Sequence, residues 1–241
     1  MIASITLLAE NDYVGMTFWL ATAIMLASTV FFFIERSDVS GKWRTSMTVA
    51  GLVTGIAFWH YLYMREAHLQ GEVTTVFRYI DWLITVPLQI VEFYLILAAV
   101  TAVTSVLFWR LLGASLVMLV FGFLGEAGLM DVTVGFIIGM AGWIYIIYEI
   151  FAGEAAKLSE DSKNAGGQFA FNTLRLIVTV GWAIYPIGYF LGYLSGSETT
   201  DFGTVNIIYN IADLVNKTAF GLAIWVGATT VSYTHLRAHE T

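Results

Sequence analysis

The residues with the clearest chemistry are Lys217 and Asp213, which lie one helical turn apart in the segment NIADLVNKTAF. Both sit in a long apolar stretch, where a lysine at membrane depth costs about 2.5–3.5 kcal/mol and is retained chiefly for function. A desolvated lysine can present a neutral amine, which condenses with a carbonyl compound to give a Schiff base. Lys217 is therefore the first candidate for a covalently held cofactor.

A second group of ionisable residues lies in the apolar segment RYIDWLITVPLQIVEFYLIL, which contains Arg78, Asp81 and Glu92. Asp81 and Glu92 are eleven residues apart, so on a helix they share a face about 16 Å apart along its axis. Asp81 could simply pair with Arg78, because buried ion pairs can be purely structural. Glu92 has no evident basic partner, and such a carboxyl is expected to stay protonated and able to donate a proton.

The composition indicates a membrane protein. Of 241 residues, 58% are hydrophobic and 12% are charged, about half the charged share of a soluble domain. The chain has no cysteine, which excludes disulfides and thiolate metal sites, and no metal site is predicted. The net charge of −7 comes without a basic cluster, so no nucleic-acid partner is expected.

The apolar runs are long enough to cross a bilayer, which takes about 20 helical residues. They predict an all-α fold, a seven-transmembrane helix bundle whose short connections leave no separate soluble domain. The expected spans are residues 13–34, 43–64, 73–99, 104–125, 132–151, 169–194 and 202–232.

The basic residues predict the orientation of this bundle. One side carries eight of the eleven, namely Arg36, Lys42, Arg44, Arg110, Lys157, Lys163, Arg175 and Arg237. The opposite side carries Arg65, and the other two lie inside spans. The positive-inside rule then places the N-terminus outside and the C-terminus in the cytoplasm. In this orientation Asp81 lies towards the exterior and Glu92 towards the cytoplasm, as a proton path requires.

Three segments together, RYIDWLITVPLQIVEFYLIL, GWAIYPIGY and NIADLVNKTAF, closely resemble the microbial (type I) rhodopsins, specifically the proteorhodopsins of marine bacteria. The resemblance runs through all seven spans in order, and its D-W-L-x-T-x-P and D-x-x-x-K motifs are each specific. It implies a light-driven outward proton pump that binds all-trans retinal, and therefore an ion transporter rather than an enzyme.

The resemblance also implies a role for each ionisable residue. Lys217 would hold retinal as a protonated Schiff base, and Asp81 would be its counterion and proton acceptor. Asp213 would be the second counterion, Arg78 would lie beneath them on the exterior side, and Glu92 would return a proton from the cytoplasmic side.

Three further polar residues gain a role from the resemblance. Asp81, Thr85 and Glu92 form the D-T-E triplet of outward proton pumps. His60 matches a histidine that hydrogen-bonds the counterion, although a lone histidine on an apolar helix is more often an ordinary core residue. Gln89 occupies the position that sets the absorption colour in this family, where glutamine accompanies blue absorption. Without the resemblance, it could equally form an interhelical hydrogen bond.

Aromatic residues at helical spacing resemble the walls around retinal in this family, although aromatic residues in membrane helices usually serve packing or anchoring. The predicted wall residues are Trp82, Trp182, Tyr185 and Tyr189, with Trp143 and Met118 at the ring end.

Residues 1–232 are thus expected to form one retinal-binding membrane domain, a multi-pass protein of the bacterial inner membrane and its lipid bilayer. The family implies a homo-oligomer, a pentamer or hexamer. The ending 233–241 does not resemble the family's usual ending, which favours a cloning or assembly junction over a native tail. The main alternative function is a sensory photoreceptor of the same fold with a slow photocycle. A seven-span transporter or receptor without retinal is disfavoured by the set Lys217, Asp213 and Asp81.

Overall fold

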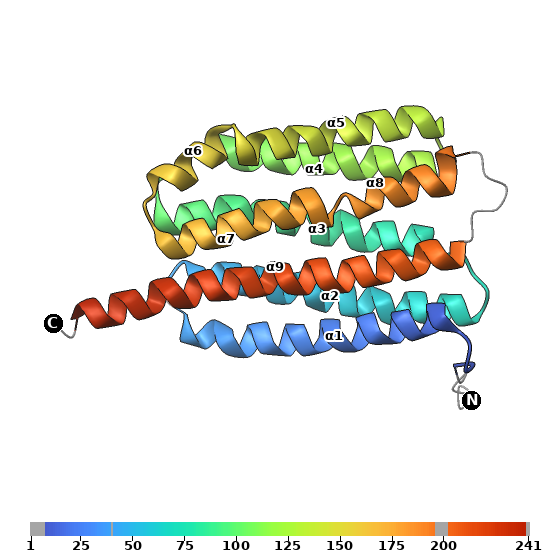
Figure 1. The fold of residues 1–241 in the computed structure, drawn as a ribbon, viewed down its shortest axis with the longest axis horizontal. Helices are drawn as coiled ribbons and strands as arrows, with labels where there is room; N and C mark the ends of the chain where they lie inside the picture. The colour runs from blue at the N-terminus through green and yellow to red at the C-terminus, as the bar shows by residue number, and fades with distance from the viewer. Residues whose placement is uncertain (1–7, 40, 196–201, 240–241) are drawn as a thin grey trace.

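Seven segments long and apolar enough to cross a membrane run side by side in the described part of the chain (Figure 1). The computed structural model describes residues 8–39, 41–195 and 202–239, without the side chains of Phe202 and of 233–239. The predicted all-α bundle of seven spans is confirmed, with no strand among the described residues.

Six spans consist of one main helix each, and their ends fall within about five residues of the predicted ones, apart from the C-terminal end of α9. They are α1 (Tyr13–Glu35), α2 (Trp43–Leu69), α3 (Thr75–Val100), α4 (Ser105–Glu126), α5 (Val132–Phe151) and α9 (Phe202–His239). Short helices extend two of them at their ends, η1 (Arg36–Asp38) after α1 and α6 (Glu154–Asp161) after α5. Because α9 continues to His239, the predicted boundary after residue 232 does not coincide with the end of a helix.

The sixth span differs most from its prediction. It begins at Ala165 instead of residue 169, and it is not a regular α-helix. It consists of α7 (Ala165–Leu176), a wide π-type turn η2 (Ile177–Gly181), α8 (Ile184–Tyr189) and a second wide turn η3 (Phe190–Leu194). In η2 the N–H of Trp182 bonds to the carbonyl of Ile177, five residues back, at 3.0 Å.

Local sequence explains several helix ends and one close helix contact. The side chains of Asp12, Asp131 and Asn164 accept hydrogen bonds from the first backbone N–H groups of α1, α5 and α7, which have no partner within the helix. Glycine lets α5 approach α4, since a Cβ on Gly142 would lie 2.8 Å from the carbonyl oxygen of Ala114.

The helices contact one another in chain order, and α9 closes the ring against α1 (Figure 1). The spans of α3 and α9 are the most enclosed, with 50% and 56% of their apolar windows buried against 22% for α4. These two helices carry Lys217, Asp213, Asp81, Arg78 and Glu92 of the predicted site, so the bundle holds those residues in its interior.

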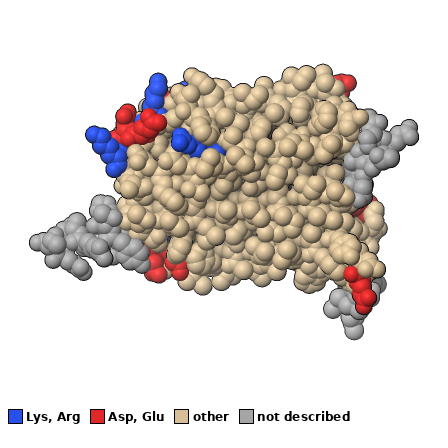
Figure 2. Space-filling model, viewed as in Figure 1, with Lys and Arg blue, Asp and Glu red and all other residues tan. Residues whose placement is uncertain are grey.

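On the face shown in Figure 2, the exposed charged side chains lie towards the two ends of the bundle, and an apolar belt separates them. In that view the lysines and arginines lie towards the end near the C-terminus, while the N-terminus lies at the opposite end (Figure 1). Large apolar side chains such as Trp109 and Val180 are exposed on the flanks. Such a surface fits lipid, and the protein is a membrane protein.

Candidate functional site

The centre of the bundle holds a lysine between two carboxylates. The Lys217 ammonium of α9 donates a hydrogen bond to Oδ2 of Asp81 on α3 and lies 3.2 Å from Oδ2 of Asp213. Lys217 is 3% exposed, and both carboxylates are fully buried. A buried charge is tolerated only when it is paired, so the three charges stabilise one another.

The two carboxylates differ in their other partners. Asp213 accepts hydrogen bonds from the hydroxyl of Tyr185 at 2.6 Å, from the hydroxyl of Tyr61 at 2.8 Å and from Nε1 of Trp82 at 3.1 Å. Oδ1 of Asp81 has no hydrogen-bond partner among the described residues. Donors that bond a carboxylate favour its charged form. Asp213 is therefore held as an anion, while Asp81 keeps an oxygen open to a proton.

Thr85 and His60 both lie beside Asp81. The Thr85 hydroxyl donates to the backbone carbonyl of Asp81 at 3.0 Å and not to its carboxylate. Nδ1 of His60 lies 3.7 Å from Oδ1 of Asp81, an ion-pairing distance longer than the predicted hydrogen bond. The same nitrogen lies 2.9 Å from the carbonyl of Ile56. The imidazole is thus near enough to influence Asp81 by charge.

Arg78 is bound by neutral groups. It donates to the Tyr61 hydroxyl at 3.1 Å and to the side-chain oxygens of Asn206 and Asn210, both at 2.9 Å. In the described residues it makes no ion pair with Asp81, so the reading of these two as a structural pair is not supported. Arg78 lies one turn nearer than Asp81 to the N-terminal end of α3, on the side predicted to be external.

Glu92 lies three turns further along α3 and is fully buried. Neither of its carboxyl oxygens has a hydrogen-bond partner among the described residues, although Ser46 of α2 is a polar neighbour. Another buried glutamate, Glu149 on α5, is instead partnered by Arg110 at 3.7 Å and by the N–H of Ala155 at 3.2 Å. Glu92 is thus suited to carry a proton rather than a charge.

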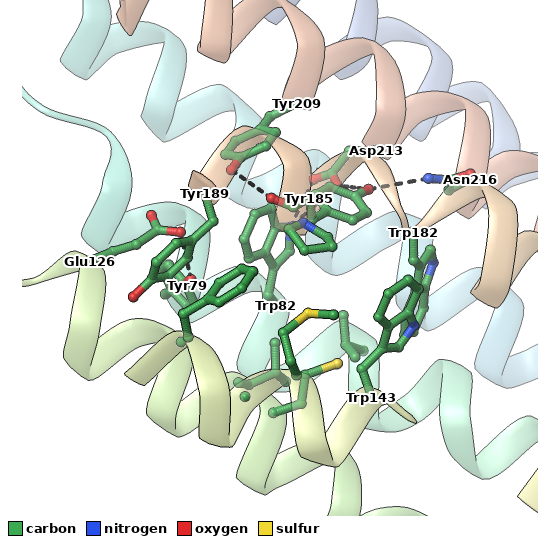
Figure 3. A pocket seen from close by; sticks show the side chains of 18 of the residues that line it. Tyr79, Trp82, Glu126, Trp143, Trp182, Tyr185, Tyr189, Tyr209, Asp213 and Asn216 are labelled. Atoms are coloured by element: carbon green, nitrogen blue, oxygen red, sulfur yellow. Dashed lines mark hydrogen bonds between the residues drawn. The ribbon is translucent and has the colours of Figure 1, made fainter. Parts of the chain in front are cut away.

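A cavity between α3, α4, α5, α8 and α9 opens beside Lys217 (Figure 3). Nine of the residues predicted from the sequence line it: Trp82, Gln89, Met118, Trp143, Trp182, Tyr185, Tyr189, Asp213 and Lys217. Trp143 and Trp182 stand together on one side of it, and Tyr79, Tyr189 and Glu126 stand on another (Figure 3). The cavity is therefore an apolar, aromatic chamber with an amine in its wall.

The whole bundle matches one family. The model of bacteriorhodopsin-like proteins matches residues 12–231, which span all seven helices. The chain belongs to the bacteriorhodopsin-like family.

Individual relatives agree with this family membership. The chain is 60% identical over 216 residues to the blue-light absorbing proteorhodopsin of Gamma-proteobacterium Hot 75m4, across 89% of this chain and 86% of that protein. The crystal structure of blue light-absorbing proteorhodopsin from Med12 is 63% identical, covers 91% of this chain and 99% of its own, and gives a TM-score of 0.79. Xanthorhodopsin, described as a light-driven ion pump with dual chromophore, is 26% identical, covers 95% and 97%, and gives a TM-score of 0.81.

Membership in the bacteriorhodopsin-like family implies a retinal chromophore, and the residues of the cavity fit that group. Retinal is a long apolar aldehyde. Lys217 is the one amine among the described lining residues, and aromatic side chains form much of the wall. An aldehyde needs a lysine for covalent attachment, and its apolar chain needs an apolar chamber. Lys217 and Asp213 line the cavity together, so a charge on the lysine nitrogen keeps its counterion.

Several members of this bacteriorhodopsin-like site were not predicted from the sequence. Asn206 and Asn210 hold Arg78, and their spacing to Asp213 and Lys217 follows one face of α9. Residues 206, 210, 213 and 217 are four, three and four positions apart, which is the spacing of one helix face, so their common face could have been predicted from the sequence. Tyr61 donates to Asp213 from α2, and no local pattern indicates a contact so distant in sequence.

Glu126, at the end of α4, was also missed. It lines the cavity and accepts a hydrogen bond from the Tyr79 hydroxyl at 2.9 Å. Its position at the terminus of a predicted span gave no reason to place it in the interior.

Proposed function

We propose that this chain is a light-driven outward proton pump with all-trans retinal bound to Lys217. One observation carries the proposal: a buried amine lies between two buried carboxylates, and a third buried carboxyl, Glu92, lies three turns along the same helix as Asp81. The names of the relatives support it, since two are blue-absorbing proteorhodopsins and one is described as a light-driven ion pump. Moving a proton alters no substrate covalently, so the protein acts as a transporter and not as an enzyme.

Bound retinal supplies the absorption of light and a change of shape that reorients the proton on the Lys217 nitrogen. Before light, Asp81 and Asp213 stabilise the positive charge on that nitrogen, since opposite charges within about 4–6 Å favour the charged form. Asp81 then accepts the proton, because its Oδ1 has no competing donor. Asp213 keeps its charge, because three donors hold it.

Direction follows from the order of the groups along α3. Asp81 lies nearer the end of the bundle that carries the N-terminus, which we propose faces the exterior. Glu92 lies nearer the end that carries most basic residues, which we propose faces the cytoplasm. Glu92 returns a proton to the Lys217 nitrogen from its own side. Arg78, held by Asn206 and Asn210, lies on the exit side, where its charge lowers the energy of an ionised Asp81 after release.

The remaining residues position the chromophore and set its colour. Trp82, Trp182, Tyr185, Trp143, Met118 and Tyr189 form the walls of the cavity. Gln89, which is buried and lines the cavity, places an amide beside the chromophore and sets blue absorption. Its Nε2 has no hydrogen-bond partner among the described residues, which leaves its dipole available to the chromophore. The His60 imidazole, whose Nδ1 lies 3.7 Å from Oδ1 of Asp81, acts on the proton acceptor electrostatically.

The pump works in a bacterial inner membrane as a pentamer or hexamer of this chain. The resemblance to the proteorhodopsins supports both parts of this proposal. Residues 1–232 form its retinal-binding domain, and 233–241 form an atypical C-terminal tail.

The function is tested by the external pH of an unbuffered suspension of cells that express the chain with added retinal. Blue light acidifies the medium if the chain is an outward pump, and a protonophore abolishes the change. The control is Lys217→Ala, which removes the point of attachment and gives no response. A coloured pigment with a flat pH trace would instead favour the sensory photoreceptor, and alkalinisation would reverse the proposed direction.

A further inference from the structure

The wide turn η2 in the sixth span is tied to two other helices through its backbone carbonyls. A π-type turn takes its N–H groups out of register with the usual carbonyl partners and is frequent at functional sites. Nε1 of Trp143 on α5 donates to the carbonyl of Val178 at 2.9 Å. Nδ2 of Asn216 on α9 donates to the carbonyl of Gly181 at 3.1 Å. Both ends of the turn are therefore held by side chains.

Of these two hydrogen bonds, only that of Asn216 connects to the charged cluster of Lys217, Asp81 and Asp213. Nδ2 of Asn216 also lies 3.4 Å from the hydroxyl of Tyr185, and that hydroxyl donates to Oδ1 of Asp213 at 2.6 Å (Figure 3). Asp213 in turn lies 3.2 Å from the Lys217 nitrogen. A continuous chain of hydrogen bonds thus runs from the turn through Asn216 and Tyr185 to the counterion.

The fit between the turn and Asn216 is close. Asn216 is 5% exposed, so its amide cannot exchange these partners for bulk water. A Cβ on Gly181 would lie 2.2 Å from Oδ1 of Asn216. A side chain at position 181 would therefore push the amide away, and glycine is what allows the two to meet.

We propose that Asn216 is a positioning residue that couples the wide turn of the sixth span to Asp213. Linked hydrogen bonds reinforce one another, so the strength of the tie to Gly181 depends on the bond between Tyr185 and Asp213. A change of charge beside Asp213 then changes the strength of the hydrogen bond between Asn216 and the Gly181 carbonyl in the sixth span. Trp143 holds the same turn without contact to the charged cluster and serves as the matched control.

The test is amide hydrogen–deuterium exchange of residues 177–182 in the purified, retinal-bound protein kept in the dark. Loss of one hydrogen bond is worth about 1 kcal/mol, so Asn216→Leu should speed exchange about fivefold. Asn216→Ala repeats the test in case leucine disturbs folding. Tyr185→Phe, which removes only the hydroxyl between Asn216 and Asp213, should speed exchange in the same peptide by a smaller factor.

Double variants separate coupling from simple support of the turn. Tyr185→Phe should add nothing to Asn216→Leu, because Tyr185 acts on the turn only through Asn216. It should retain its full effect in Trp143→Phe. Additive effects of Asn216→Leu and Tyr185→Phe, or exchange unchanged in both Asn216 variants, would overturn the inference. Because the assay is done in the dark, it can fail while the pH assay of pumping succeeds, and the reverse also holds.

Discussion

Glu92→Gln separates the kinetic role of Glu92 from any structural one. Both carboxyl oxygens of Glu92 are buried without a hydrogen bond among the described residues, so glutamine of equal size removes no observed partner. The free energy of unfolding should therefore change by no more than about 1 kcal/mol. Loss of a positioned proton donor typically slows proton transfer about 10²–10⁴-fold. Recovery of the dark pigment should slow by a factor in this range.

The assay is flash spectroscopy of the purified pigment. The first loss of the visible band, when Asp81 takes its proton, should keep its wild-type rate in Glu92→Gln, while the return of the band slows. Added azide, a small diffusible acid, should restore the return in proportion to its concentration. Glu149→Gln is the matched control, because Glu149 is equally buried but is held by Arg110. Normal recovery in Glu92→Gln, or equal slowing in Glu149→Gln, would refute the donor role.

Asp81→Asn should still form a pigment, but light-driven acidification should fall at least about a hundredfold, because the acceptor is lost. Gln89→Leu should move the absorption maximum to longer wavelength, towards green; an unchanged spectrum would remove Gln89 from colour tuning. Burial raises the pKa of Asp12, but hydrogen bonds from the N–H of Gly15 and the side chain of His68 lower it by more. The pKa of Asp12 therefore lies below its ordinary value of 3.8. The stability that Asp12 contributes is therefore complete above 3.8 and is lost as the pH falls through the lower folded value. Calorimetry should show Asp12→Asn to be destabilised at neutral pH and close to wild type in strong acid.

The seven spans could be predicted from the sequence because lipid offers no hydrogen-bond partners to the backbone. Each span must satisfy its own backbone in an apolar helix, which leaves runs of about 20 apolar residues to read. The irregular sixth span could not be read in this way. The turn at Ile177–Gly181 accepts hydrogen bonds from Trp143 and Asn216, which lie on other helices.

Part of the charged cluster could also be predicted from the sequence. Asp213 and Lys217 are one turn apart on one helix, so their proximity follows from local geometry. Their contacts with Asp81 and Tyr61 join helices far apart in sequence, and only the family resemblance linked Asp81 to Lys217 in advance. The partners of Arg78 were not anticipated, because an arginine three residues from an aspartate suggests a pair with that aspartate, whereas the structure gives it two asparagines and a tyrosine.

The proposed mechanism depends on the transfer of the proton from the Lys217 nitrogen to Asp81. Time-resolved infrared spectroscopy after a flash can follow this transfer, since a protonated carboxyl has its own carbonyl stretch. We expect such a band to rise with the same time constant as the visible band is lost, and to be absent in Asp81→Asn. A carboxyl band that survives in Asp81→Asn, or one that rises out of step with the visible change, would show that another group takes the proton.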